Sequence, residues 1–212
     1  QVNVEEVKPL PEDMTREGME YLLALRGDAV SGKSLLSTTI QTAFLLSRLM
    51  EPMHLGGQEV KAYGKKVFVF ADDLDVINRL YHSLMDAEGW ERFNRPNDRQ
   101  FGALANLRAS HRDDHAFRLD DGQSWDLVEK IGHSLQDGQR SGVGRVSSQD
   151  SGVDQSASVI VATSSLEVGY DDPEVGAVIQ HKAPRNAASY LQRKGRAGRG
   201  REMRPWTKIV LS

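Results

Sequence analysis

The chain has 212 residues, enough for one large domain or for a domain with an extension. Hydrophobic residues make up 39% and charged residues 27%, as in ordinary globular proteins, and the formal net charge of −3 is not that of a strongly basic nucleic-acid module. The absence of cysteine excludes disulfides and cysteine-based metal sites within the chain. No apolar run approaches the ~18 residues of a membrane helix, and the first residues do not form a signal peptide. We therefore expect a cytoplasmic fragment of a longer protein.

The first 60 residues are predicted to form an N-terminal arm and a helical extension. Residues 1–14 contain two prolines and are assigned to the arm. Thr15 is the predicted N-cap of a helix that runs to Arg26. A second helix is predicted over residues 33–50, where apolar side chains keep near-helical spacing.

The main domain is predicted over residues 61–212. Its first unit is the apolar run VFVFA at residues 67–71, which has the length of a parallel strand buried on both faces, followed by a helix over residues 72–89. A helix is also predicted over residues 187–194. The remaining strands are predicted at residues 159–162, 177–180 and 207–211. This alternation predicts a parallel α/β sheet, in which ligands bind at the carboxyl ends of the strands.

Residues 90–150 are polar and are predicted as an insertion in that domain. One helix is expected after the N-cap Ser124, and a short strand near residues 144–146. Histidines and aspartates at residues 111–121 raise the alternative of a metal site, but we favour a solvated loop and assign no metal ligand.

Basic side chains gather near the end of the chain. From Lys182 to Arg204 there is one acid, Glu202, and eight lysines and arginines. The eight are Lys182, Arg185, Arg193, Lys194, Arg196, Arg199, Arg201 and Arg204. A basic tail on an otherwise acidic chain indicates a local anion site.

The strongest motif lies in this tail and has the form Q-R-x-G-R-x-G-R. It contains Gln192, Arg193, Arg196 and Arg199. Its glycines end the helix and let guanidinium groups approach a ligand closely. Two arginines three residues apart converge on one polyanion, and the guanidinium fork suits phosphate oxygens. The motif predicts an arginine-finger site, with a basic loop that touches solvent or a nucleic-acid backbone as the alternative.

A second motif lies upstream, between the strands predicted at residues 159–162 and 177–180. Thr163 and Ser164 offer hydroxyl and backbone N–H groups to a phosphate, a contact that positions a nucleic-acid strand without reading its sequence. Asp171 follows a glycine turn and is placed to accept a hydrogen bond from a ribose hydroxyl. The structural alternative is Thr163 as an N-cap and Asp171 as a turn former.

The segment ATSSLEVGYDDP, followed by QRKGRAGR, resembles motifs V and VI of superfamily 2 helicases, and KKVFVFADDLDVINRLYHSL resembles motif IV. The form Leu-Glu-Val-Gly is most similar to Lhr-type helicases and to DEAD/DEAH-box-like helicases, some from anti-phage defence operons. The resemblance implies a RecA-like second motor domain, a parallel sheet sandwiched by helices. It implies that Arg196 and Arg199 are catalytic finger residues. The residues that it places near the nucleotide are Gln192, Arg193, Gly169 and Asp171.

The same resemblance implies that Thr163, together with Ser164, contacts a nucleic-acid backbone. Relatives usually carry a His-His-x-Ser-like segment before motif V, whereas this chain has RVSSQD at residues 145–150. Ser147 or Ser148 is therefore assigned a backbone contact, with Ser148 as the chosen candidate. The expected partners are nucleic acid, with DNA favoured over RNA, and an N-terminal helicase domain of the parent chain that holds most of ATP and Mg²⁺.

Residues 27–34, GDAVSGKS, fit the phosphate-binding pattern G-x4-G-K-S of P-loop ATPases. In such an enzyme Lys33 would reach phosphates, and Asp72 at the end of VFVFAD would hold a metal ion. However, only about 30 residues separate Ser34 from Lys65, too few for a first motor domain. YLLALRG also continues a helical pattern better than it makes a strand. We therefore expect a chance match within a helix–loop–helix.

The predicted function is the C-terminal motor domain of an ATP-dependent nucleic-acid helicase or translocase, inactive as an isolated fragment. Two alternatives from other classes remain. One is a self-contained P-loop ATPase, which a nucleotide-binding titration with Lys33→Ala as control would separate. The other is a non-catalytic RecA-like module that binds nucleic acid or protein, which a DExx box one domain upstream would argue against.

Overall fold

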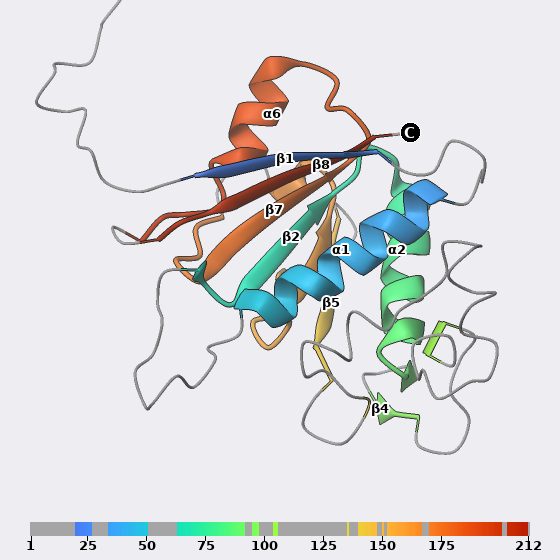
Figure 1. Cartoon of the computed structure of the whole chain (residues 1–212). Coiled ribbons are helices and arrows are strands. Elements are labelled where there is room, and N and C mark those ends of the chain that lie inside the picture. Colours follow the sequence, from blue (N-terminus) through green and yellow to red (C-terminus); the bar gives the residue numbers. More distant parts are fainter. Residues whose placement is uncertain are drawn as a thin grey trace, which may run out of the picture.

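Six parallel strands form the main sheet, in the order β1-β8-β7-β2-β6-β5 (Figure 1). The computed structural model describes residues 20–26, 34–50, 63–91, 95–97, 104–105, 135, 140–147, 150, 152–166, 170–200 and 203–211. The strands of the sheet are β1 (Tyr21–Arg26), β2 (Lys66–Phe70), β5 (Val143–Val146), β6 (Val159–Ala162), β7 (Val175–His181) and β8 (Trp206–Leu211). A separate ribbon pairs β3 (Trp90–Glu91) with β4 (Arg95–Pro96).

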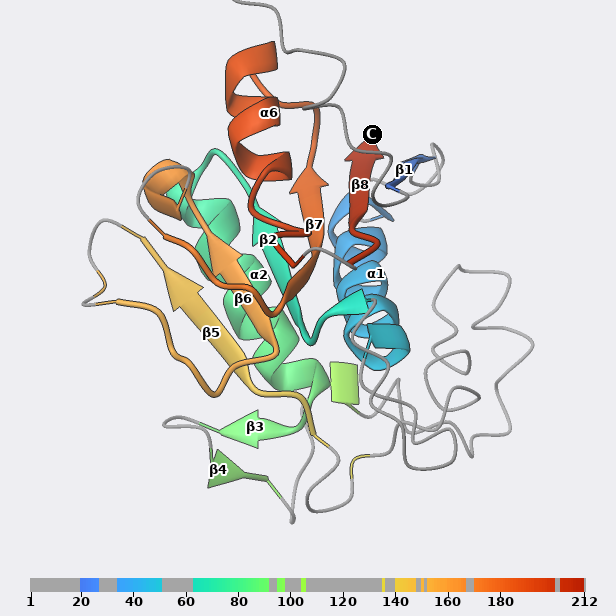
Figure 2. The ribbon, with the colours of Figure 1, turned by 90° about the vertical axis from the view of Figure 1, so that its left-hand side faces the viewer.

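Helices cover both faces of the sheet, as Figures 1 and 2 show. The long helices α1 (Ser34–Met50) and α2 (Leu74–Ala87) pack on one face, and the short α6 (Ala187–Lys194) lies on the other. A single 3-10 turn, η2 (Ser164–Leu166), follows β6. The predicted fold class is confirmed as far as a parallel α/β sheet between helices. None of the described helices is long and apolar enough to cross a membrane.

The two faces of β2 belong to two different apolar clusters. Val67 and Val69 pack with α1 and α2, whereas Phe68 and Phe70 face the side on which α6 lies. Every residue of β2 is buried, because neighbouring strands and elements on both faces remove it from water. The continuous apolar run therefore predicted this strand correctly.

The helix predicted up to Arg26 is wrong over its last six residues, which form the edge strand β1. β1 pairs in parallel with β8, and the ring of Tyr21 stacks on Trp206 at 4.4 Å between centroids. Consecutive Leu22 and Leu23 are both exposed, so the apolar pattern does not alternate as a half-buried strand would. The helix predicted at residues 33–50 is confirmed as α1. The division of the chain at residue 60 stays a prediction, although β1 pairs within the main sheet and α1 packs against it.

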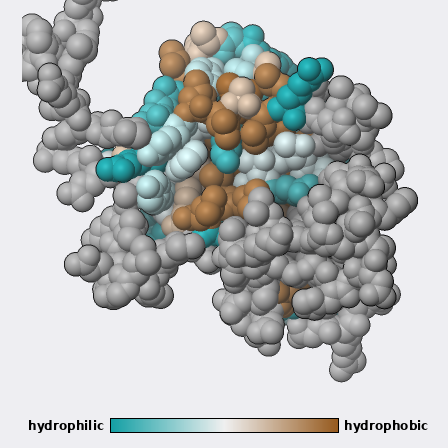
Figure 3. Space-filling view, in the orientation of Figure 1, coloured by the Kyte–Doolittle hydropathy of each residue, from teal (hydrophilic) through white to brown (hydrophobic). Residues whose placement is uncertain are grey.

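Apolar surface is exposed around α6 and β1 (Figure 3), where Leu191 and Leu22 are the most exposed large apolar side chains of these two elements. Leu191 lies in the middle of α6. The apolar side chains of this helix are therefore not what docks it on the sheet.

The two ends of the predicted insertion are held together by hydrogen bonds to Ser141. The indole Nε1 of Trp90 donates to the carbonyl oxygen of Ser141 at 2.7 Å. The fully buried carboxylate of Glu88 accepts from the N–H of Ser141 at 2.8 Å and pairs with Arg48 at 3.2 Å. These contacts tie α1, the end of α2 and the start of β5 together. β5 confirms the short strand predicted near residues 144–146, whereas the helix predicted after Ser124 and the histidine–aspartate cluster at residues 111–121 lie outside the described residues.

Candidate nucleotide and nucleic-acid site

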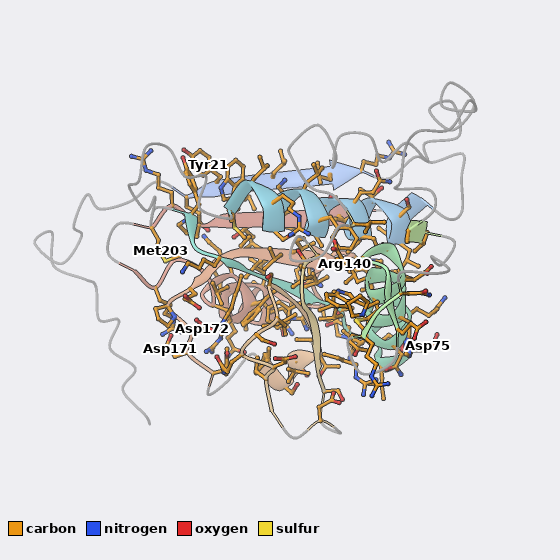
Figure 4. All side chains as sticks on the ribbon, turned by 90° about the horizontal axis from the view of Figure 1, so that it is seen from below. Tyr21, Asp75, Arg140, Asp171, Asp172 and Met203 are labelled. Carbon is orange, nitrogen blue, oxygen red and sulfur yellow. The ribbon has the colours of Figure 1, made fainter. Side chains whose placement is uncertain are left out.

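The predicted site residues form two groups at opposite ends of the parallel strands. Thr163 and Ser164 follow the carboxyl end of β6, whereas Asp171 lies just before the amino end of β7. Figure 4 shows Asp171 beside Asp172, on the far side of the molecule from Asp75 at the start of α2. The strand-end loops and the arginine motif therefore do not share one pocket.

The arginine turn packs against the segment that precedes β7. α6 begins at the N-cap Asn186 and ends at Gly195, after which the chain turns back toward the sheet. Arg196 Nη1 donates to the carbonyl oxygen of Tyr170 at 2.5 Å. Arg199 Nε donates to the carbonyl oxygen of Gly195 at 3.1 Å and lies 3.4 Å from Asp171 Oδ1. The structure thus brings Arg196, Arg199 and Asp171 together.

The glycine at position 198 is required by the path of this turn. Its backbone has a φ of +78°, and a Cβ atom there would lie 2.5 Å from Cγ of Pro205. The N–H of Gly198 donates to the carbonyl oxygen of Val175 at 3.0 Å, which joins the turn to the first residue of β7. The backbone path between Arg196 and Arg199 therefore depends on a glycine at position 198.

A buried ion pair fixes the segment that receives the arginines. Lys66 Nζ lies 2.7 Å from Asp172 Oδ2, and the hydroxyl of Tyr170 donates to the same oxygen at 3.1 Å. Burial opposes the charged form of both groups, but hydrogen bonds and mutual attraction outweigh it. The pKa of Lys66 is therefore raised, and the pKa of Asp172 is lowered, relative to their ordinary values. Sequence reasoning missed this pair. Its only signal was a lysine at the head of an otherwise apolar strand.

Arg193 and Gln192 are placed differently from each other. The side chain of Arg193 is 3% exposed; its Nη1 donates to Oε1 of Gln180 at 2.7 Å, and its Nη2 donates to Asp72. Gln192 is exposed on α6. Contact of either residue with phosphates stays a prediction, but the guanidinium of Arg193 is engaged inside the domain.

The position of Asp72 bears on the P-loop match. In the order β1-β8-β7-β2, two strands separate the ends of β1 and β2, which at the usual spacing corresponds to about 14 Å. The Asp72 carboxylate also pairs with Arg193. Asp72 is thus engaged by Arg193 within the sheet domain. Among the described residues, no group of histidine or carboxylate side chains is arranged to hold a metal ion.

The second group lies where β5 and β6 end. Thr163 Oγ1 and Ser165 Oγ lie 2.9 Å apart, Ser164 is exposed, and the N–H of Thr163 donates to the carbonyl oxygen of Val146 at 3.1 Å. A contact of Thr163 and Ser164 with a nucleic-acid backbone stays a prediction.

The neighbouring loop after β5 holds Ser147 in a closed hydrogen-bonded arrangement. Its hydroxyl donates to Asp150 Oδ2 at 2.7 Å, and Arg145 pairs with the same carboxylate at 2.9 Å. Although burial opposes it, these two partners lower the pKa of Asp150. Ser147 is therefore buried in this loop, whereas the predicted contacts Ser148 and Gly169 lie outside the described residues.

Comparison with known proteins gives one family match and several structural similarities. Residues 117–201 match the family described as the helicase conserved C-terminal domain. No curated protein matches the chain. Saccharomyces cerevisiae Dbp5 bound to RNA and ADP BeF3 is 12% identical over 99% of this chain and 39% of its own, with a TM-score of 0.47.

Two further solved structures are similar at the same level. Mycobacterium smegmatis helicase Lhr bound to ssDNA and AMP-PNP is 16% identical over 92% of this chain and 20% of its own, with a TM-score of 0.46. Escherichia coli DEAD-box protein SrmB bound to the regulator RraA is 18% identical over 92% of this chain and 79% of its own, with a TM-score of 0.41. The chain thus spans less than half of Dbp5 and of Lhr. The family match thus assigns residues 117–201 to the helicase conserved C-terminal domain.

Proposed function

We propose that this chain is the C-terminal motor domain of an ATP-dependent nucleic-acid helicase or translocase. The observation that carries the proposal is the convergence of Arg196 and Arg199 on the segment that contains Asp171. Two guanidinium groups in one turn, beside a carboxylate suited to a ribose hydroxyl, form half of a nucleotide site. A preceding RecA-like domain of the parent chain would provide the other half.

The exposure of these side chains fits a nucleotide brought up by such a domain. Arg199 and Asp171 are 40% and 66% exposed, so phosphate oxygens and a ribose hydroxyl can reach them. When bound, ATP with Mg²⁺ supplies the phosphoryl group whose transfer to water drives the motor. Arg196 and Arg199 would place positive charge where negative charge develops on the phosphoryl oxygens.

The hydroxyls at the carboxyl end of β6 are proposed to contact a nucleic-acid strand. Thr163 and Ser164 would donate to phosphate oxygens and thereby position the strand. Phosphates are common to DNA and RNA, so these contacts do not support the predicted preference for DNA. Competition between single-stranded DNA and RNA of one sequence would measure any preference.

Substitution of Arg199 tests the finger assignment. In the full-length protein, Arg199→Ala should lower nucleic-acid-stimulated ATP hydrolysis about 10³-fold or more, since an arginine finger contributes that much to kcat. Binding of a labelled single strand should stay within about twofold, because its proposed contacts lie at the other end of the strands. The exposed Arg204→Ala is the matched control. Unchanged turnover in Arg199→Ala would exclude the assignment.

A self-contained P-loop ATPase is a second candidate, and one observation favours it. β1 ends at Arg26 and α1 begins at Ser34, so GDAVSGKS lies between a strand and a helix, the order that a phosphate-binding loop requires. The helix–loop–helix expectation was wrong on this point. Nucleotide titration of this chain, with Lys33→Ala as control, separates the candidates: saturable binding lost in the variant favours the P-loop, and no binding favours the half-site.

A further inference from the structure

The helix α6 is docked by one buried side chain, and that side chain is an arginine. Of its eight residues, all described, Arg193 alone is buried. Ala187, Ala188 and Leu191 are exposed. Apolar packing would hold a helix through many weak contacts, whereas this anchor depends on the orientation of a few polar groups.

The anchor bridges two strands of the sheet. Arg193 donates to Asp72, just beyond β2, and to the amide oxygen of Gln180, in β7. Its guanidinium carbon also lies 5.5 Å above the ring of Phe70. A planar guanidinium can serve two acceptors at fixed angles while stacking on a ring, which a lysine ammonium cannot do.

This anchor lies between the two groups of site residues. Asp72 follows the carboxyl end of β2, and β2 pairs with β6, the strand that ends at Thr163. In the other direction, Arg196 comes three residues after Arg193 and contacts Tyr170. A shift of the Arg193 guanidinium must therefore move the turn that carries the finger residues.

Asp72 is placed to respond to an anion at the strand ends. Its side chain is partly exposed, and Nε of Arg185, a side chain that is 76% exposed, lies 3.6 Å from its Oδ2. A phosphate at this edge would attract Arg185 and repel Asp72. Both effects would change the electrostatic interaction between Asp72 and the guanidinium of Arg193.

We propose that Arg193 is a positioning residue, which sets the orientation of the Arg196–Arg199 turn and, through Asp72, couples that turn to nucleic acid bound at the carboxyl ends of β2 and β6. The coupling to nucleic acid rests on the proposed function. The contacts of Arg193 with Asp72 and Gln180 do not. This positioning role differs from the direct phosphate contact that the motif alone implies for Arg193.

Hydrogen exchange tests the anchor without any assumption about activity. In the full-length protein, Asp72→Asn and Arg193→Gln should each speed exchange of the α6 amides by at least about tenfold, because removing one partner of an ion pair whose arginine is 3% exposed is destabilising. Exchange in β2, β6 and β7 should stay unchanged. Asp75→Asn, which removes an exposed carboxylate three residues further on, is the matched control. Unchanged α6 exchange in Asp72→Asn would overturn the proposal.

Steady-state kinetics test the coupling. Asp72→Asn should lower nucleic-acid-stimulated kcat about tenfold while the KM for ATP stays within about twofold, because Asp72 acts through Arg193 and does not touch the nucleotide. Arg193→Lys should restore less than half of the turnover lost in Arg193→Gln, since it cannot serve both acceptors. A raised KM in Arg193→Gln with wild-type kinetics in Asp72→Asn would instead indicate direct phosphate contact and overturn the coupling.

The two experiments separate the failure of one proposal from that of the other. Faster α6 exchange in a protein whose wild type hydrolyses no ATP would leave the anchor standing and reject the motor function. If α6 exchange is unchanged in Asp72→Asn while Arg199→Ala abolishes ATP hydrolysis, the anchor is rejected and the motor function stands.

Discussion

Nε of Arg199 lies 3.4 Å from Oδ1 of Asp171, so the last arginine of the turn is paired with the carboxylate that precedes β7. The same carboxylate is proposed to accept a hydrogen bond from ribose. In the proposed site, Asp171 would thus stand between Arg199 and the sugar of the nucleotide.

Asp171→Ala is expected to affect both kinetic constants of the full-length protein. Loss of the ribose contact should raise the KM for ATP, and loss of the ion pair should lower kcat, each by about tenfold, the effect of one hydrogen bond to a charged group. Steady-state ATP hydrolysis measures both. An unchanged KM would contradict the ribose assignment.

Gly198→Ala should destabilise the domain more than Gly195→Ala does. At Gly198 the left-handed backbone and the contact with Pro205 both oppose a methyl group, and we expect a loss of about 1–3 kcal/mol in the free energy of unfolding. Gly195 has a φ of −66°, which alanine adopts readily. Denaturant unfolding of the two variants makes the comparison, and equal losses would contradict it.

Lys66→Met should destabilise the domain by about 3 kcal/mol, because it leaves the buried carboxylate of Asp172 without its cation. The double variant Lys66→Met/Asp172→Asn should recover part of that loss, since neither position of the pair then carries a charge. The free energies of unfolding of the wild type, both single variants and the double variant form the required cycle. A double variant no more stable than Lys66→Met would argue against a charge effect.

Stability should fall between pH 6.5 and pH 4 through the buried imidazole of His181. Its Nδ1 lies 2.8 Å from Oγ1 of Thr39; burial first, and then the charges of Lys182 and Arg79, lower its pKa to about 4. The unfolded chain takes up this proton near pH 6.5 and the folded chain only near pH 4. The contribution of about 3 kcal/mol is therefore complete above pH 6.5 and is lost as the pH falls.

The variant His181→Asn isolates this effect. The difference in unfolding free energy between wild type and variant should shrink from pH 7.5 to pH 4.5 in urea titrations. A difference that stays constant with pH would show that the imidazole does not titrate as expected.

Most of the sheet could be predicted because parallel strands buried on both faces are continuous apolar runs. β2, β6 and β8 lie within one residue of their predicted bounds, β7 within two, and α6 at its predicted bounds. β1 could not be predicted in this way. Its partner β8 lies at the other end of the chain, and the sequence YLLALR lacks the alternation of apolar and polar residues that distinguishes a strand from a helix.

The candidate site was predictable only in part. Spacing indicated that Arg196 and Arg199 share one turn, and the structure places Asp171 beside them. Spacing could not indicate that Arg193 points inward, because that depends on Asp72, 121 residues away in the chain. A motif shows which residue stands at a position, but the direction in which its side chain points depends on tertiary contacts.

The bond between the Trp90 indole and the Ser141 carbonyl has a consequence for how this domain can change. It joins Trp90, which follows α2, to Ser141, which precedes β5, so we expect the length of the chain between them to have little effect on the strands. Doubling such a length costs only about 0.6 kcal/mol in closure entropy. A reporter protein inserted between these two residues should therefore leave the sheet in place.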